Sequence, residues 1–343
     1  MKILQYIAAG ALALVAASAG AAHFTMKDWE LACDNTRACE AVGYQADDGD
    51  SAPVTLWLGR PAGPSGAVAA KLGVYADTEV GPLTLRVGKL TLRGLTSDAE
   101  LSSAQIARLL PALLDADSAE VSDGKAKWRL SLVGMKAVLL KMDDLQGRVG
   151  TVTALVRPGS KPAGAVLPPL PAPVLRPLAL PPVRKQDAAL LPVIVKTLPK
   201  GGCDEQPELF GGGESQREIH RLSASKMLVL VECGRGAYQS SFAVWIADDK
   251  APYAAQLVRL PYENGMQEPE LLGAWFDKGT LSSLGKGRGL ADCNTQVSWV
   301  WTAEGFKLSS SSSGSLCRGV WGGYMLSDWR TVNAENSEPR RAD

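Results

Sequence analysis

Short runs of apolar residues, some continuous and some alternating with polar ones, recur along the chain and predict β-strands. In the first half these runs are rich in Leu, Val and Trp and are separated by Gly, Asp and Asn. Runs of this length and composition are typical of strands. In this half they cover residues 29–33, 54–58, 83–87, 89–93, 127–132 and 151–156. In the second half they cover residues 227–231, 238–246, 256–260, 271–276, 297–301 and 306–308.

Two segments of the first half show helical spacing instead. Ser102 and Gln105 form the pattern of a capping box, in which a serine and a glutamine close the first turn of a helix. The apolar residues that follow at helical spacing are Ile106, Leu109, Leu110, Leu113 and Leu114. Pro111 predicts a kink or an early end of this helix. A second helix is expected from about 135 to 145, stopping near Gly147.

These patterns predict an α+β fold with two domains. A mixed N-terminal α+β domain is expected over residues 23–157 and an all-β C-terminal domain over residues 200–335. Between them, residues 158–199 are rich in proline. Proline lacks an amide hydrogen and fixes φ, so this stretch is expected to be an extended, semi-rigid linker. Residues 336–343 form a polar tail.

The N-terminus has the order of features of a secretory signal peptide. Lys2 precedes an apolar run over residues 3–17 and a small-residue stretch over residues 17–22, which is the pattern that is cleaved on export. We expect residues 1–22 to be removed, a mature start near His23, and a periplasmic or secreted protein. No later apolar stretch is long enough to span a bilayer, so no integral membrane span is expected after cleavage.

The charge balance of the chain indicates which kind of partner to expect. Lys and Arg number 36, as do Asp and Glu. This balance argues against a nucleic-acid partner, which would favour a basic excess. The unknown partner is expected in the envelope or the extracellular space.

An exported chain makes disulfides the expected state of the six cysteines. Sequence leaves several pairings open, and proximity favours Cys33–Cys39, Cys203–Cys233 and Cys293–Cys317. The cysteine spacings are not those of a metal site and the chain has 2 histidines, so neither a metal nor a cofactor is expected.

The chain resembles an exported proteobacterial family of unknown function over essentially its whole mature length. The resemblance is carried by residues 28–39, 43–45, 131–134, 142–148, 275–281, 287–293 and 299–301. The family implies export but no established activity. The N-terminal half is more loosely similar to the invasion-associated locus B proteins, in the order of its tryptophan strand, two cysteines, helix and Ser-Leu-x-Gly strand end. It lacks the further cysteine pair of those proteins, and Met135 and Lys136 replace their aromatic continuation.

The best candidate for a ligand site is the glycine-rich loop over residues 285–289. Lys286 and Arg288 could hold an anion together with backbone amide groups. Trp299 and Trp301 occupy alternate positions of one predicted strand and share a face. If that face is exposed it offers a stacking platform for a sugar ring, and if it is buried it belongs to the core.

The signals for catalytic residues are weaker than those for the ligand site. His23 lies at the expected mature terminus, and His220 lacks the nucleophile elbow of a serine hydrolase. The residues of 47–50 are interpreted as a hydrated turn, and Asp143 and Asp144 as polar positions near a helix end. Folding could also bring together carboxylates from the set Asp277, Asp292, Glu263 and Glu270.

The favoured hypothesis is a non-catalytic binding or accessory protein of the envelope. One alternative is an enzyme acting on cell-envelope carbohydrate or peptide, which would use such paired carboxylates. A second alternative is a host-directed invasion-associated factor.

Overall fold

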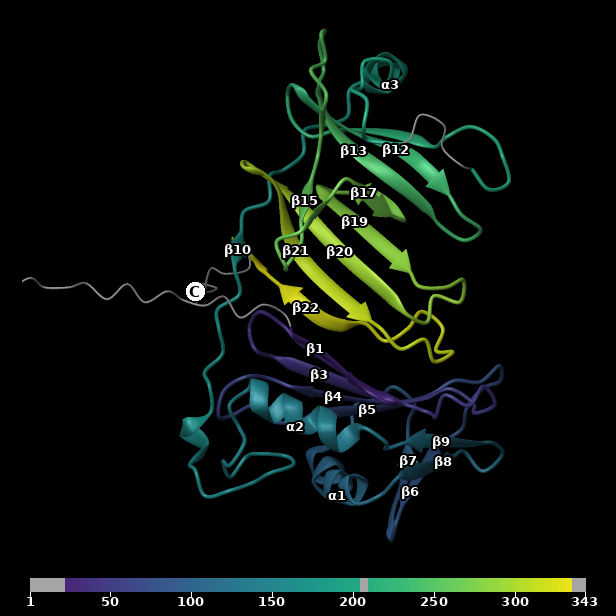
Figure 1. Cartoon of the computed structure of the whole chain (residues 1–343), viewed down its shortest axis with the longest axis vertical. Helices are drawn as coiled ribbons and strands as arrows, with labels where there is room; N and C mark the ends of the chain where they lie inside the picture. The colour runs from purple at the N-terminus through teal and green to yellow at the C-terminus, as the bar shows by residue number, and fades with distance from the viewer. Residues whose placement is uncertain (1–21, 204–208, 335–343) are drawn as a thin grey trace, which may run out of the picture.

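The structure is a computed structural model that describes residues 22–203 and 209–334. Residues 1–21 of the predicted signal peptide and the predicted polar tail, residues 336–343, lie outside the described residues. The molecule is elongated, with the N-terminal sheets at one end and the C-terminal sheets at the other (Figure 1). Within the described ranges, no helix is long and apolar enough to cross a membrane.

The N-terminal part, residues 22–157, is built on two antiparallel sheets. The first follows chain order and holds β1 (Ala22–Met26), β2 (Trp29–Cys33), β3 (Cys39–Tyr44), β4 (Val54–Arg60) and β5 (Ala69–Val74). The second has the order β7-β6-β8-β9 and holds β6 (Leu83–Val87), β7 (Leu90–Leu95), β8 (Ser118–Ser122) and β9 (Lys127–Ser131). Most neighbouring strands are joined by short connections, which favours antiparallel pairing.

Two helices cover these sheets. In α1 (Ser103–Leu114) the Ser102 hydroxyl accepts the Gln105 amide at 3.3 Å, and the Gln105 side chain accepts the Ser102 amide at 2.7 Å. The predicted capping box is therefore present. Pro111 neither ends the helix nor prevents its inner face from being buried. The second helix, α2 (Met135–Leu145), has the predicted bounds and starts after Gly134, whose φ of 100° favours glycine.

The core of the N-terminal part centres on Trp29, which is fully buried. Its indole nitrogen donates to the carbonyl of Ser131 at 2.9 Å. Gly43 packs directly against the Trp29 indole ring, and a side chain at this position would begin 2.0 Å from an indole carbon. The close approach of β3 to the indole therefore requires glycine.

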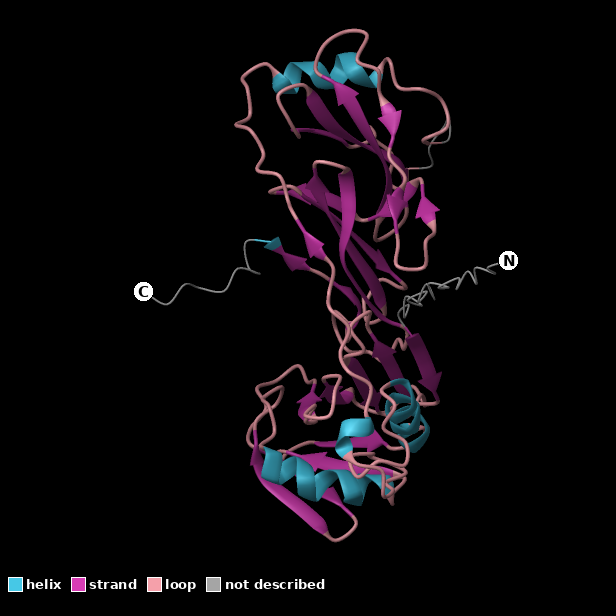
Figure 2. Ribbon diagram, turned by 90° about the vertical axis from the view of Figure 1, so that its left-hand side faces the viewer, coloured by secondary structure: helices cyan, strands magenta, loops and turns pink. Residues whose placement is uncertain are grey.

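The proline-rich segment, residues 158–199, is attached to both parts along its length. It contains a short 3-10 turn (Ala163–Ala165), β10 (Val174–Leu175) and α3 (Asp187–Val195). Its backbone amides at Leu167 and Leu170 donate to carbonyls of the N-terminal part, and that of Leu178 donates to Trp301 at 2.9 Å. β10 pairs in parallel with β23 (Val332–Asn333), and α3 covers one C-terminal sheet (Figure 2).

The C-terminal part consists of two larger antiparallel sheets and one small one. The first holds β11 (Arg217–Arg221), β12 (Lys226–Arg235), β13 (Ser240–Asp248) and β14 (Gln256–Leu257), with β17 (Glu270–Leu272) also paired to β13. The second holds β18 (Ala274–Asp277), β19 (Thr280–Lys286), β20 (Asn294–Thr302), β21 (Gly305–Gly314) and β22 (Leu326–Arg330). The small sheet pairs β15 (Leu260–Pro261) with β16 (Gln267–Glu268). Side chains such as Leu230, Val244, Leu281 and Trp299 form the core shared by the larger sheets.

The predicted α+β class is wrong, because the described chain is mostly β. Its helical segments are α1, α2, α3 and one 3-10 turn. In the N-terminal part the two helices cover antiparallel sheets and do not form a separate helical layer of comparable extent. The predicted strand over residues 151–156 is also wrong. There the amides of Leu155 and Val156 donate to the buried carboxylate of Asp143 at 2.7 and 3.0 Å, which replaces strand pairing.

We predict that Gly43→Ala lowers the free energy of unfolding by about 3 kcal/mol, because the new methyl group overlaps the buried Trp29 ring. Denaturant titration of the purified protein measures this change. Gly164→Ala is the matched control, since no atom lies within 4 Å of a side chain at that position. Equal effects of the two substitutions would contradict the steric explanation.

Candidate functional site

The two parts meet where side chains of the first sheet reach the outer edge of β22. The Asn35 carboxamide donates to the Arg330 carbonyl at 3.0 Å and accepts the Arg330 amide at 2.9 Å. The Glu40 carboxylate accepts the Ser327 amide at 2.9 Å. Side chains of the N-terminal part thus satisfy backbone groups that an unpaired strand edge would leave exposed.

A buried carboxylate fastens the other side of this junction. The Glu30 side chain accepts the Tyr44 hydroxyl at 2.8 Å, and it accepts the amide and hydroxyl of Ser315 at 2.8 and 2.6 Å. Burial raises the pKa of Tyr44, as does neighbouring Glu30, so the phenol stays protonated and donates. A small apolar cluster spans both parts beside it and contains Ala32, Val42, Tyr44, Val320 and Leu326.

A hollow of about 320 Å³ opens at the rim of the junction, and we call it the junction hollow. It is lined by His23, Phe24, Thr25, Thr295, Ser313, Gly314 and Ser315. His23 Nε2 contacts the buried Asp328 carboxylate and also lies 3.1 Å from the Ser313 hydroxyl. In a serine–histidine–aspartate triad the two partners use different ring nitrogens. In this structure the same nitrogen, Nε2, contacts both Asp328 and Ser313. The arrangement is therefore an ion pair that joins residues near the two ends of the described chain.

A second hollow, of about 400 Å³, lies at the turn between β12 and β13, and we call it the tip hollow. It is lined by residues 234–239 together with Ser241 and Leu272. The Gln239 carboxamide connects it to the glycine-rich loop: it accepts the Lys286 amide at 2.9 Å and donates to the Lys286 carbonyl at 3.3 Å. The structure therefore brings the predicted loop beside this hollow.

The four predicted ligand-binding residues fall in two places. Lys286, half-buried, ends β19 beside the tip hollow, and Arg288, exposed, lies on the loop that follows. Trp299 is fully buried between the C-terminal sheets and donates to the Pro261 carbonyl at 2.6 Å. Trp301 is partly buried and packs on Phe306 at a ring distance of 5.1 Å. Both tryptophans therefore contribute to the core, although Trp301 keeps some exposure.

Arg288 is held by a structural partner. Its guanidinium contacts both oxygens of the buried Asp292 carboxylate, which also accepts the Gly319 amide at 2.6 Å. Burial by itself would raise the pKa of Asp292, but the hydrogen bonds from Arg288 and Gly319 outweigh it and hold this pKa below its usual value.

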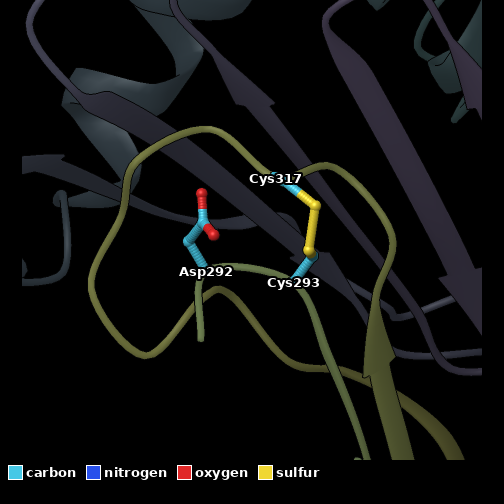
Figure 3. Close-up of side chains that lie close together, drawn as sticks. All are labelled: Asp292, Cys293 and Cys317. Atoms are coloured by element: carbon cyan, nitrogen blue, oxygen red, sulfur yellow. A yellow bond between two sulfur atoms is a disulfide. The ribbon is translucent and has the colours of Figure 1, made fainter. Parts of the chain in front are cut away.

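Asp292 lies next to Cys293 and Cys317, a grouping that has the residue types of a metal site (Figure 3). The two sulfur atoms are joined in a disulfide, and disulfide sulfur is not the thiolate that binds metals. The carboxylate is shared between Arg288 and Gly319, as described above. The grouping therefore has a structural role. The disulfide and the Arg288–Asp292 ion pair together hold the loop after Cys317, and we call this arrangement the staple.

All six cysteines are paired, and the pairs are those that proximity along the chain favours. They are Cys33–Cys39, Cys203–Cys233 and Cys293–Cys317. Disulfides persist in oxidising compartments and are rare in the cytosol. The three bonds therefore indicate a compartment outside the cytoplasm.

The remaining candidate residues occupy separate places. His220 is half-buried and lies 3.0 Å from Glu218. Of the four carboxylates that folding could have brought together, Asp292 is held by Arg288, Asp277 is exposed on β18 and Glu270 is exposed on β17, while Glu263 is half-buried after β15.

The acidic pairs serve local structure. Asp143 is buried and pairs with Arg60 at 3.2 Å. Burial raises the pKa of Asp143, although its hydrogen bonds and the nearby arginines oppose that rise. Asp144 is exposed and pairs with Lys141 at 3.1 Å. Asp48 accepts the amides of Asp50 and Ser51 in an exposed turn.

Sequence reasoning missed the junction residues Glu30, Asp328, Ser313 and Ser315. Each lies in a strand or turn without any local signal of a partner, and its contacts come from the other end of the chain. The serine-rich run of β21 was the one visible hint, because hydroxyl groups on a strand need hydrogen-bond partners when they are buried.

The sheets, the sealed junction and the three disulfides define a β-rich, disulfide-bonded protein of an oxidising compartment. Residues 23–334 match the family described as protein of unknown function DUF1176, and the chain belongs to that family. This confirms the resemblance to a family of unknown function. The chain is 30% identical over 336 residues to the uncharacterized protein YpfG of Escherichia coli (strain K12), covering 87% of this chain and 90% of that protein. No solved structure matches the chain significantly.

We predict that the His23–Asp328 pair stabilises the junction at acidic pH and is lost on the alkaline side. The hydrogen bond that His23 donates to Asp328 raises the pKa of His23 above 6.5, although burial opposes this. The stabilisation is therefore complete below the unfolded-state pKa and disappears as pH rises through the folded-state pKa. His23→Gln should lower the free energy of unfolding by about 1 kcal/mol at about pH 5 and by little at about pH 8.5.

Denaturant titration at the two pH values measures this effect. His220→Gln, which removes the other histidine at its exposed pair with Glu218, is the control. The same pH-dependent loss in both variants would show that the effect does not come from the junction.

We predict that Arg288→Leu lowers the free energy of unfolding by about 2 kcal/mol, because it leaves the Asp292 carboxylate buried without its cation. Lys286→Leu should change it by less than about 0.5 kcal/mol, since the Lys286 ammonium has no hydrogen bond or ion pair with the described residues. Thermal or denaturant unfolding compares the two. If Lys286→Leu costs as much as Arg288→Leu, the staple does not depend on the Asp292 ion pair.

Proposed function

We propose that this protein is a non-catalytic binding protein of the bacterial cell envelope, located in the periplasm, and that it holds its partner at the tip hollow. The observation that carries the proposal is the group of exposed apolar side chains around a hollow whose frame is fixed by the ion pair between Arg235 and the buried Glu232 carboxylate. Exposed apolar groups gathered around a concavity are typical of interaction sites.

The apolar rim comes from four separate segments. Tyr238 and Leu272 line the hollow and are 45% and 43% exposed. Leu290 is also exposed and follows Gly289, where a side chain would begin 3.8 Å from the Tyr238 ring. Phe210 is exposed too, and its amide donates to the Arg235 carbonyl at 2.8 Å. A partner docking here would cover apolar surface that water now contacts.

The hairpin that carries the hollow is held in place by the buried carboxylate of Glu232. Arg235 donates to the Glu232 carboxylate at 2.7 and 2.6 Å, and the Ser240 hydroxyl donates to it at 2.6 Å. These contacts, led by the one from Arg235, lower the pKa of Glu232 to about 2, so the pair stays charged in any envelope condition. A preformed hollow loses little conformational entropy when it binds.

The charge near the hollow favours a partner with an anionic group. Arg235 retains partial exposure, and Lys286 has an ammonium group that no described residue pairs with. A partner that combines an apolar surface with a carboxylate or phosphate would satisfy both the rim and this lysine. That chemistry fits a protein or lipid-linked component of the envelope.

Export is supported by three observations. The first is the N-terminal signal pattern over residues 1–22, and the second is the set of three disulfides. The third is that the family match begins at residue 23, next to the expected mature start. We infer from these that the mature chain begins near His23 and works in the periplasm.

The proposal predicts that a photo-crosslinking residue at Tyr238 or Leu272 traps a discrete partner in living cells. The same residue at Val152, which is 60% exposed on the N-terminal part, is the matched control. Lys286→Glu in the Tyr238 background should abolish the crosslinked species, because it reverses the charge that holds the partner. Mass spectrometry of the osmotic-shock fraction should find the protein at the mass of a chain that begins near His23.

Two results would overturn the proposal. Crosslinks equally strong at Val152, or unaffected by Lys286→Glu, would show that the tip hollow is not the binding surface. Recovery of the protein only in the cytosol with free thiols would remove the envelope assignment.

A further inference from the structure

The outer edge of β1 lies open, unlike the opposite edge of the same sheet. At that opposite edge, the chain after β7 covers β5: Asp98 and Leu101 donate amides to Leu72 and Ala70 at 2.8 and 2.9 Å. No comparable backbone partner covers β1 among residues 22–203 and 209–334. Only the Met26 carbonyl is shielded, by the close approach of Gly134.

An open strand edge presents amide and carbonyl groups that can pair with another chain. Proteins that use such an edge for recognition gain affinity from the backbone pairing. They gain specificity from pockets that take alternate side chains of the added strand. β1 has hollows on both of its faces, as the following contacts show.

The junction hollow lies on the face of β1 that carries His23 and Thr25. It is rich in hydroxyl groups, because Thr25 lies 3.3 Å from Ser315 and Ser313 lies close to His23. This hollow therefore suits a small polar side chain that can exchange hydrogen bonds with hydroxyl groups.

The second hollow, of about 410 Å³, lies between Phe24 and α2, and we call it the helix hollow. Its apolar lining comes from Phe24, Ala137, Leu140 and Val149, and its charged lining from Lys141, Asp144 and Arg157. Lys141 and Asp144 pair with each other at 3.1 Å. The exposed Arg157 guanidinium has no ion-pair or hydrogen-bond partner among the described residues.

We propose that the β1 edge binds an extended peptide segment of another protein as an added strand. An apolar side chain of the peptide enters the helix hollow, and an acidic side chain two positions away, on the same face, reaches Arg157. The residue between them is small and polar and faces the junction hollow. This surface is separate from the tip hollow and does not depend on the function proposed for it.

Charge decides between such a peptide and a second copy of the chain. β1 has the sequence Ala-His-Phe-Thr-Met and contains no acidic residue. Edge-to-edge pairing of two copies of β1 would therefore bring an aromatic ring to the helix hollow but no carboxylate to Arg157. A peptide with an acidic residue satisfies both.

The test uses the full mature protein and the capped peptide Thr-Leu-Ser-Glu-Thr, with a fluorescent label for anisotropy. We expect saturable binding, and NMR shifts confined to residues 23–26 and the two hollows. Arg157→Glu should weaken binding roughly tenfold, and the peptide Thr-Leu-Ser-Lys-Thr should recover it on that variant. Arg157 is exposed, so this variant is expected to fold.

Backbone pairing is tested separately by methylating the amide nitrogens of the peptide, one position at a time. Methylation at positions that face β1 should abolish binding, and at alternate positions it should leave binding unchanged. Binding that no methyl group affects, or no binding at all, would overturn the proposal. So would a concentration-dependent dimer that protects the β1 amides and excludes the peptide. Lys286→Glu should leave peptide binding unchanged, which separates this result from that at the tip hollow.

Discussion

The relation between the two parts of the molecule depends on the hydrogen bonding of one strand edge. β22 is the last strand of its sheet, and its amides at Ser327 and Arg330 face the N-terminal part. Glu40 and Asn35 supply the acceptors, and burial raises the pKa of Glu40. Both hydrogen bonds are partly buried, and losing one acceptor would cost about 1 kcal/mol. The N-terminal part thus supplies hydrogen-bond acceptors to the edge strand of the C-terminal sheet. This contact fixes where the junction hollow and the open edge of β1 lie.

Within each part, buried carboxylates likewise accept hydrogen bonds and so hold nearby segments of the chain. Asp143 holds the turn after α2, Glu232 holds the β12–β13 hairpin and Asp292 holds the loop at Gly319. Each has a fully buried side chain and an arginine partner. A buried ion pair of this kind adds little net stability, but losing one partner is costly. The pairs therefore fix the conformation of the loops and turns that they hold.

Local features of the fold were predictable where the signal lies within a few residues. The capping box at Ser102 and the bounds of α2 follow from hydrogen bonds and side-chain spacing inside one turn of helix. The predicted fold class is wrong because the two helical patterns are the clearest local signals in the sequence, whereas most of the described chain forms short strands. The error at residues 151–156 has a different cause. β-branched residues predicted a strand, but a buried carboxylate elsewhere in the sequence took their amide hydrogens.

The sequence by itself determined many of the strands, the helices α1 and α2 and the nearby cysteine pairs, because each depends on contacts between residues close along the chain. Tertiary structure alone decided that Trp299 belongs to the core and that His23 meets Asp328 from the opposite end of the chain. It also decided which edge of the first sheet has no backbone partner among residues 22–203 and 209–334. These outcomes depend on how whole sheets pack and on which buried polar groups find partners. Hydrophobic periodicity records that a face is buried, but not the surface that buries it.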